Sequence, residues 1–336
     1  MDGKVKIINK ILVMMESNVL ILLGNGYNRA LGLRTSYADF GSHYLTHIDV
    51  PDSALNRFLV DSFSQDPRNW SDMENEVKKF ALTYKPSKMS SEAEMRYFDC
   101  LIKDVSFYMD GEAKYQFLCK AIQKQSEMQK TLPMFIFQAI LNRQDYHYKV
   151  LSFNYTDMSP ILQELGSVLL PVGEDFETLD SEEKRDYINT INSIVDVEYI
   201  HLSGKKCILG IDDDPRIHPD LNFLKKAYQF EASSNYPQNL RQYRTIIAYG
   251  LSFGETDSDF CRILFDGILE RERKDNPRFL FITKDEDGKK GILNNLVRRF
   301  NVPLSIIQRH LDYEFILTDD YDKSEMKSTV LKALMC

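Results

Sequence analysis

Residues 19–23 (VLILL) form an uninterrupted apolar run that ends at Gly24. Such a run, closed by glycine, is typical of a parallel strand that is buried on both faces. Helical patterns, as at 257–273 and 287–299, alternate with further short apolar runs. Those runs lie at 148–153, 197–202, 244–249 and 279–283. The alternation predicts an α/β fold with a doubly wound, Rossmann-like parallel sheet that is flanked by helices.

The chain changes character between about residues 50 and 143, where helical periodicity dominates and strand-like runs are few. Lys, Glu, Gln and Met are frequent in this part. We therefore predict a helical insertion at 49–145, which divides a Rossmann-like nucleotide-binding domain into residues 1–48 and 146–336.

Composition excludes several classes of protein. With 336 residues, of which 43% are hydrophobic, the chain can bury a sizeable core, and its apolar runs are too short to cross a membrane. A net charge of -8 opposes sequence-independent binding of nucleic acid, and no basic patch compensates for it. Five scattered cysteines without a Cys-x-x-Cys pair argue against disulfides and structural zinc. We expect a cytoplasmic protein without a targeting segment, a membrane contact or a metal site.

Gly24 and Gly26 directly follow the first predicted strand, at the position where α/β folds hold phosphate groups. The spacing differs from the dehydrogenase fingerprint, because Arg29 stands where the third glycine belongs, so by itself the pattern is equally typical of a structural tight turn without a ligand. Polar residues and glycines also follow three other predicted strands, at 152–157, 201–204 and 249–257. The carboxyl ends of parallel strands share one edge of a sheet, so these segments are expected to meet in one ligand-binding crevice.

Several residues near these strand ends have two interpretations. Thr35 and Ser36 either begin a helix, with Ser36 and Asp39 as a capping pair, or bind a ligand through their hydroxyls. Asp257 either caps the helix that follows it or contacts the ligand, and capping is favoured. Arg29 and Arg34 flank the glycine turn and are candidates for neutralising phosphate.

Trp70, Asp72 and Glu74 open a predicted helix of the insertion. We expect Trp70 to pack against the sheet domain and the two carboxylates to support the helix N-terminus. A carboxylate pair that activates water in the crevice is the alternative.

Five spaced motifs together resemble the AbiH family of bacterial phage abortive-infection proteins. They are GNGYNRALGLRTSYADF (24–40), WSDME (70–74), FNYTD (153–157), HLSG (201–204) and YGLSFGETD (249–257). The resemblance extends from residue 19 to about 265 and implies a role in antiviral defence, that is, in phage resistance.

The same motifs more distantly resemble the sirtuin-type NAD-binding fold, which implies NAD as the ligand or substrate. By position, the resemblance assigns nucleotide contacts to Gly24, Asn25, Gly26, Asn154, Gly204, Gly250 and Ser252. Thr35, Ser36 and Asp257 complete the set of candidate nucleotide-binding residues.

The chain departs from both patterns at titratable positions. AbiH proteins usually carry Asp, His and His where this chain has Asn28, Ser203 and Leu251, so the general base of the sirtuin pattern would fall on Ser203. His201 lies two residues earlier and would point to the same side of a continuous strand. Asn154 and His201 are therefore the catalytic candidates, although His201 is equally compatible with a buried structural role.

Two functions remain open from the sequence. The first is an NAD(P) glycohydrolase, a hydrolase that depletes the nucleotide in an infected cell. The second is a non-catalytic nucleotide-binding sensor or interaction module that responds to a phage or host protein. Whether the chain forms a homo-oligomer is also left open.

Overall fold

The computed structural model describes residues 19–47, 53–86, 90–113, 115, 131–141, 148–156, 195–203, 206–229, 243–254, 257–319 and 323–334. Its centre is a six-stranded sheet in which every neighbouring pair of strands is parallel. In spatial order the strands are β3 (Val195–Tyr199), β2 (Tyr148–Ser152), β1 (Val19–Leu23), β6 (Thr245–Tyr249), β7 (Arg278–Thr283) and β8 (Asp312–Leu317). Counted along the chain this is the order 3-2-1-4-5-6 of a doubly wound sheet, which confirms the Rossmann-like α/β prediction.

The order of the strands reverses between β1 and β6, which are direct neighbours in the centre of the sheet. Both strands are buried along their whole length, in agreement with the apolar residues that make up all of β1 and most of β6. In sheets of this kind the loops that leave two such strands diverge to opposite faces and open a crevice between them. The fold therefore places the loops after Leu23 and Tyr249 at the expected ligand position.

One strand of the six-stranded sheet, the edge strand β8, was not predicted. The sequence of β8, DYEFIL, carries two acidic residues, and the first four positions of the strand are only partly buried. An edge strand is covered less completely than a central one, so its hydrophobic signal is weaker.

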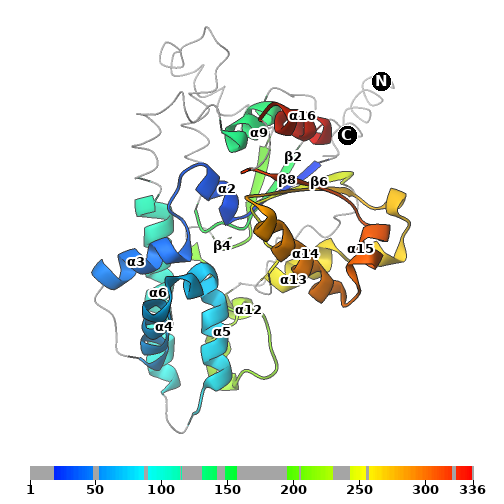
Figure 1. Ribbon diagram of the computed structural model, residues 1–336. Helices are drawn as coiled ribbons and strands as arrows, with labels where there is room; N and C mark the ends of the chain where they lie inside the picture. The colour runs from blue at the N-terminus through cyan, green and yellow to red at the C-terminus, as the bar shows by residue number, and fades with distance from the viewer. Residues whose placement is uncertain are drawn as a thin grey trace, which may run out of the picture.

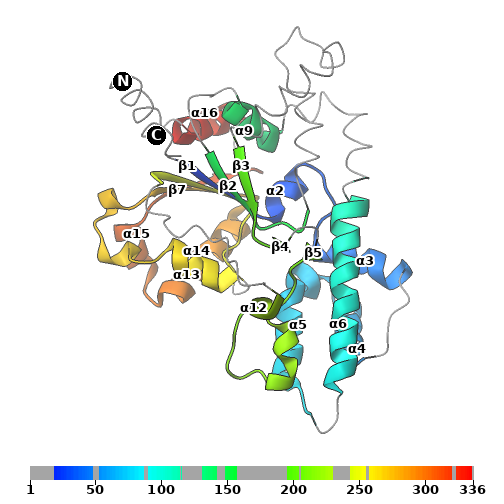
Figure 2. The same ribbon diagram turned by 180° about the vertical axis from the view of Figure 1, so that it is seen from behind.

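Helices cover both faces of the sheet (Figures 1 and 2). Alternate residues of β1 point into two separate hydrophobic cores, one on each face. The first core is covered by α2 (Asn25–Ala30), α9 (Leu132–Leu141) and α16 (Lys323–Leu334). The second is covered by α13 (Ser258–Leu264), α14 (Glu286–Phe300) and α15 (Leu304–His310), with the short turns η7 (Ile268–Glu270) and η8 (Arg273–Asp275) nearby in the chain.

A third hydrophobic core lies in a group of helices beyond the carboxyl ends of β1 and β2, here called the helical lobe (Figure 1). The lobe contains α3 (Tyr37–His47), α4 (Ala54–Gln65), η1 (Pro67–Asp72), α5 (Met73–Thr83), α6 (Ser91–Ser106) and η2 (Phe107–Glu112). Against them lie the hairpin of β4 (Leu202–Ser203) and β5 (Lys206–Cys207), together with η4 (Pro219–Leu224) and α12 (Lys226–Gln229).

Trp70 packs inside the helical lobe, so the prediction that it packs against the sheet domain is wrong. Its ring is fully buried between Phe40 and Phe63, and its Nε1–H donates to the carbonyl of Leu59 at 3.1 Å. Helices α3, α4 and α5 contact η1, and the tryptophan supplies volume to the core that they share.

The division of the chain at residues 49 and 145 stays a prediction. Hydrophobic contacts associate α3 with the lobe, although it precedes residue 49, and α9 with the sheet, although it precedes residue 145.

The strand that was predicted at 197–202 ends earlier than expected. β3 stops at Tyr199, and the chain bends at Ile200 and His201 before Leu202 pairs with Cys207 in the antiparallel hairpin. His201 and Ser203 therefore do not share one continuous strand, and the argument that their side chains point to the same side does not hold.

Three glycines bring the loops after β1 and β6 into main-chain contact. The N–H of Gly24 donates to the carbonyl of Tyr249 at 2.9 Å, and the N–H of Gly26 donates to the carbonyl of Gly250 at 3.1 Å. A Cβ atom on any of the three glycines would overlap main-chain atoms of the opposite loop. Gly250 also has a φ of 64°, which side chains other than glycine rarely adopt.

We therefore predict that Gly250→Ala lowers the free energy of unfolding by about 2–5 kcal/mol, through overlap and left-handed strain together. The measurement is urea denaturation followed by far-UV circular dichroism. Gly291→Ala is the matched control, because a Cβ at this position on α14 meets open space. It should leave stability unchanged or raise it by up to about 1 kcal/mol.

Candidate functional site

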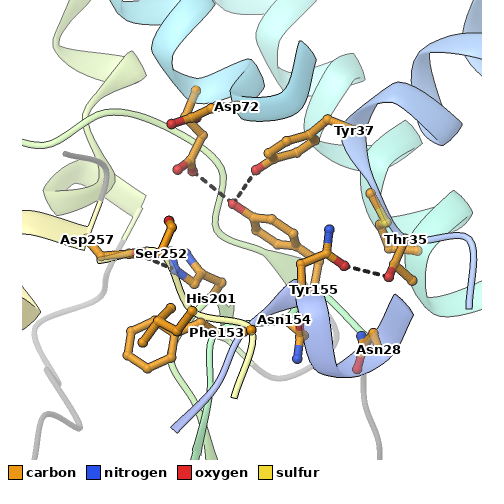
Figure 3. A pocket seen from close by; sticks show the side chains of 16 residues that line it. Asn28, Thr35, Tyr37, Asp72, Phe153, Asn154, Tyr155, His201, Ser252 and Asp257 are labelled. Carbon is orange, nitrogen blue, oxygen red and sulfur yellow. Dashed lines mark hydrogen bonds and ion pairs between the residues drawn. The ribbon is translucent and has the colours of Figure 1, made fainter. Parts of the chain in front are cut away.

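A pocket of about 160 Å³ lies where the loops after β1, β2 and β6 face the helical lobe (Figure 3). The segments after the strands contribute main-chain turns, polar side chains and the rings of Phe153 and Tyr155, whereas the lobe contributes Tyr37, Asp72, Glu74 and Met109. The pocket is lined by Gly24, Asn25, Asn28, Thr35, Tyr37, Asp72, Glu74, Met109, Phe153, Asn154, Tyr155, His201, Gly250, Leu251, Ser252 and Asp257.

Most of the residues that the sequence nominated meet in this pocket. Both catalytic candidates line it, and so do six further nucleotide-binding candidates: Gly24, Asn25, Thr35, Gly250, Ser252 and Asp257. Gly26 instead packs against Gly250. Ser36 is absent from the lining and caps α3, where the N–H of Asp39 donates to its Oγ at 3.0 Å. Gly204 lies outside the described residues.

The glycine turn is already occupied by main-chain hydrogen bonds. The N–H groups of Gly24 and Gly26 bind the loop after β6, and that of Tyr27 donates to the carbonyl of Gly24 at 3.0 Å. Helix α2 has only six residues, and Arg29 and Arg34 are exposed and absent from the lining. These glycines hold two loops together, and their N–H groups do not face a free phosphate site.

His201 and Asp257 form a buried pair on one side of the pocket (Figure 3). Nε2 of His201 lies 3.1 Å from Oδ1 of Asp257, and their side chains are 7% and 13% exposed. Burial alone would raise the pKa of Asp257, but the interactions with His201 and Lys226 outweigh it and hold the pKa below its usual value. An ionised carboxylate only accepts hydrogen bonds, so Nε2 of His201 carries the proton that points to Asp257, and in the neutral tautomer with this hydrogen bond the lone pair lies on Nδ1.

The favoured capping role of Asp257 is wrong. Asp257 occupies the N-cap position of α13, but its side chain makes no capping hydrogen bond there. Its carboxylate has turned toward His201, a contact between segments far apart in the chain that helix-start patterns do not indicate.

Glu74 is held by the lobe at the wall of the pocket. Oε1 accepts from the Tyr155 hydroxyl at 2.9 Å and from the N–H of Gly210 at 3.1 Å, while Oε2 lies 3.0 Å from Nζ of Lys226. Burial alone would lower the pKa of Lys226, but Glu74 and other nearby carboxylates raise it above its usual value. Lys226 and Glu74 thus form an ion pair that is almost fully buried.

Two tyrosine hydroxyls extend this network. Tyr37 donates to the Tyr155 hydroxyl at 2.7 Å, and Tyr155 donates in turn to Glu74. Burial, followed by the charge of Glu74, raises the pKa of both phenols well above the usual value. Both hydroxyls therefore stay protonated and act as donors, which fixes the direction of the chain of hydrogen bonds.

Asp72 supports the N-terminus of α5, as predicted, and also lines the pocket. Its Oδ1 accepts from the N–H of Asn75 at 3.1 Å. Burial, and then the negative charge of Glu74, raise the pKa of Asp72 from 3.8 to about 6, with Asp257 adding to the shift. Asp72 therefore exchanges its proton near neutral pH at the edge of the pocket.

Several buried polar atoms of the lining have no hydrogen-bond partner among the described residues. They are both amide atoms of Asn28, Oδ1 of Asn154 and Nδ1 of His201. The three residues are 0%, 3% and 5% exposed. Buried polar groups are normally paired, so these atoms are available for a ligand.

Sequence reasoning missed part of this site. Asn28, Tyr37 and Tyr155 were not nominated as ligand contacts. A role of Asp72 and Glu74 in the crevice was only the alternative to their support of the helix N-terminus. The signal that could have indicated them is proximity in the chain to glycine and strand-end motifs, since Asn28 follows Gly26 and Tyr155 follows Asn154. Lys226 had no such signal, because it lies in a short helix remote from every motif.

Comparison with known protein families shows to which family the chain belongs. The sequence model described as bacteriophage abortive infection AbiH matches residues 20–282, which is well over half of the chain. The chain belongs to the AbiH family. The family is described by its role in abortive infection, which is a defence of bacteria against phage. A comparison with curated proteins gave no significant match.

All five motifs that resembled the AbiH family contribute to the pocket. The glycine turn provides Asn25 and Asn28, the tryptophan motif provides Asp72, the third motif provides Asn154 and the fourth provides His201. The last motif provides the turn after β6 with Gly250–Ser252 and Asp257. Segments spread over more than 200 residues of this AbiH chain thus converge on one site.

Within the described parts of the AbiH chain, no group of three or more His, Cys, Asp or Glu side chains is arranged to hold a metal ion. Asp213 and Asp214, in the acidic turn before His218, form ion pairs with Lys225 and Arg216 instead. Over the same described residues, no helix combines the length and the apolar content that a membrane crossing demands. The cytoplasmic location stays a prediction.

We predict that Asp72→Asn stabilises this AbiH protein in a pH-dependent manner. A carboxyl group whose pKa rises from 3.8 to about 6 on folding destabilises the folded state when it is ionised, so the cost is full above pH 6 and disappears below about pH 4. Asn retains the cap but cannot ionise, and the variant should gain about 2–3 kcal/mol at pH 8 and almost nothing at pH 4. Urea denaturation at pH 4, 6 and 8 measures the difference.

Asp61→Asn serves as the control, because Asp61 lies exposed on α4. It should show no comparable change with pH. An equal gain for Asp72→Asn at all three pH values would contradict the raised pKa.

Proposed function

We propose that this AbiH protein defends bacteria against phage by binding NAD or a related nucleotide in the pocket and cleaving its bond between ribose and nicotinamide. The observation that carries the proposal is the meeting of Asn154 with the His201–Asp257 pair at the point where the strand order of a Rossmann-like sheet reverses. Polar atoms of Asn154 and His201 that lack a partner among the described residues supply the contacts that a ribose needs.

The charge of the pocket supports this chemistry. Asp72, Glu74 and Asp257 line it, whereas no Lys or Arg stands among the described residues of the lining. Cleavage of a glycosidic bond passes through an oxocarbenium-like state with positive charge on the ribose, which carboxylates in a low-dielectric site stabilise. The same carboxylates repel phosphate, so the pyrophosphate of the dinucleotide would stay outside.

The size of the pocket supports the same placement. Its volume of about 160 Å³ is smaller than the roughly 300–1,000 Å³ of sites that enclose a drug-sized ligand. A dinucleotide would therefore insert only one ribose with its attached ring.

The two catalytic candidates then have separate roles. Oδ1 of Asn154 accepts a hydrogen bond from a ribose hydroxyl and orients the sugar. Nδ1 of His201 accepts a proton from the water that adds to the anomeric carbon, while nicotinamide leaves with the electron pair of the broken bond. Asp257 fixes the required tautomer of His201.

A nucleotide sensor without catalytic activity is the second candidate. It is favoured by Leu251, which lines the pocket as a buried apolar residue where relatives in the family usually carry histidine. A sensor would bind the nucleotide and respond to a phage or host protein, and assembly of several copies would be one route to that response.

We predict that the purified protein releases nicotinamide and ADP-ribose from NAD, alone or with phage components. Asn154→Ala and His201→Ala should each reduce the rate by about 10²–10⁴-fold, as expected for loss of a positioning group or a general base. Chromatography of the products over time measures turnover, and thermal unfolding establishes that each variant is folded.

His218→Ala is the matched control for the histidine, since His218 lies at the N-cap of η4 and its side chain is 43% exposed. It should leave turnover unchanged. NAD binding without turnover would favour the sensor, and the absence of both would contradict a nucleotide site. In cells, Asn154→Ala should abolish protection against phage, and if protection survives, the role assigned to Asn154 is wrong.

A further inference from the structure

Asn28 is the most unusual polar residue of the pocket. Its side chain lines the cavity, the residue is 0% exposed, and neither atom of its amide has a partner among the described residues. Leaving a buried donor and a buried acceptor unpaired costs about 1–3 kcal/mol for each group. Such a cost at one residue indicates a group that is reserved for a ligand rather than for the fold.

Asn28 is held firmly in place. Helix α2 is anchored on one side by the ring of Tyr27, which packs edge-on against the ring of Tyr249, with 5.4 Å between the ring centroids. On the other side the carbonyl of Asn28 accepts from the N–H of Leu33 at 3.0 Å. Asn28 thus lines the pocket from a main chain that is held in place, as recognition of a specific group requires.

The surroundings of Asn28 define the chemistry that it can recognise. Asn28 and Thr35 lie on one side of Tyr155, away from His201 and Asp257 on the other side (Figure 3). The lining residues Asn25 and Thr35 on this side are uncharged, and the Thr35 hydroxyl already donates to Oδ1 of Asn25 at 2.7 Å. An uncharged amide presents one donor and one acceptor side by side, which matches a planar group with the complementary pair.

We propose that Asn28 is a specificity-determining residue whose amide forms two hydrogen bonds with an adjacent donor and acceptor on the ring of the nucleotide. This inference rests on the proposed function and names the part of the ligand that enters the pocket. Two groups have the required chemistry: the primary carboxamide of nicotinamide and the edge of adenine formed by its amino group and a ring nitrogen.

Asn28→Leu tests the proposal, because leucine has the same branched arrangement of side-chain heavy atoms and removes both unpaired polar atoms. A ligand contact and a structural contact predict opposite effects on the ligand-free protein. With a ligand role, the variant unfolds at the same temperature as the wild type or a higher one, because an unpaired buried amide is removed. With a structural role, it unfolds at a lower temperature.

Binding is measured by calorimetry with nicotinamide mononucleotide and with AMP as separate probes. We expect the wild type to bind one of them and Asn28→Leu to weaken that binding by about 10- to 100-fold. Asn294→Leu, at an exposed position on α14, is the matched control and should bind as the wild type does. If the group that Asn28 binds is the carboxamide of nicotinamide, the wild type also prefers nicotinamide mononucleotide to its carboxylic acid analogue. The variant then loses most of that preference.

The outcomes separate this inference from the proposed function. Unchanged binding by Asn28→Leu, or a clear loss of thermal stability without ligand, overturns the role of Asn28 and leaves the nucleotide site standing. A wild-type protein that binds neither probe nor NAD overturns both.

Discussion

The close packing of two glycine turns holds the site together. Gly24 and Gly26 after β1 touch Gly250 after β6 so closely that no side chain fits between the loops. This contact lies at the reversal of the strand order, where the two loops would otherwise separate. With the turns joined, the residues around them face the helical lobe across a small pocket instead of a wide crevice.

The lobe completes the pocket through buried charge. Glu74 reaches the sheet from α5 and is neutralised by Lys226, while Tyr155 connects it to the segment after β2. A buried ion pair contributes little net stability, but it is costly to break and therefore fixes the geometry of the groups that form it. The lobe and the carboxyl edge of the sheet are thus tied together through the same residues that line the pocket.

Polar groups on the two sides of the pocket differ in character. Carboxylates and the His201–Asp257 pair form one side, which suits a positively charged ribose in a transition state. Uncharged amides and a hydroxyl form the other, which suits recognition of a neutral ring edge. Under the proposed function, this division assigns the chemistry to the strand ends and the lobe, and the recognition of the ring to α2 and the loop that follows it.

Much of this arrangement could be predicted from the sequence, because short apolar runs closed by glycine identify buried parallel strands and polar residues after them identify one edge of a sheet. Asn154, His201 and the glycine turns were found in this way, whereas the edge strand β8 and the packing of Trp70 were not. Tertiary structure alone decided that Asp257 pairs with His201 instead of capping α13, that Lys226 neutralises Glu74, and that the amide of Asn28 faces the pocket. Local patterns report which side chains a strand or helix buries, but the partner of a buried charge comes from a distant segment and depends on how the elements pack.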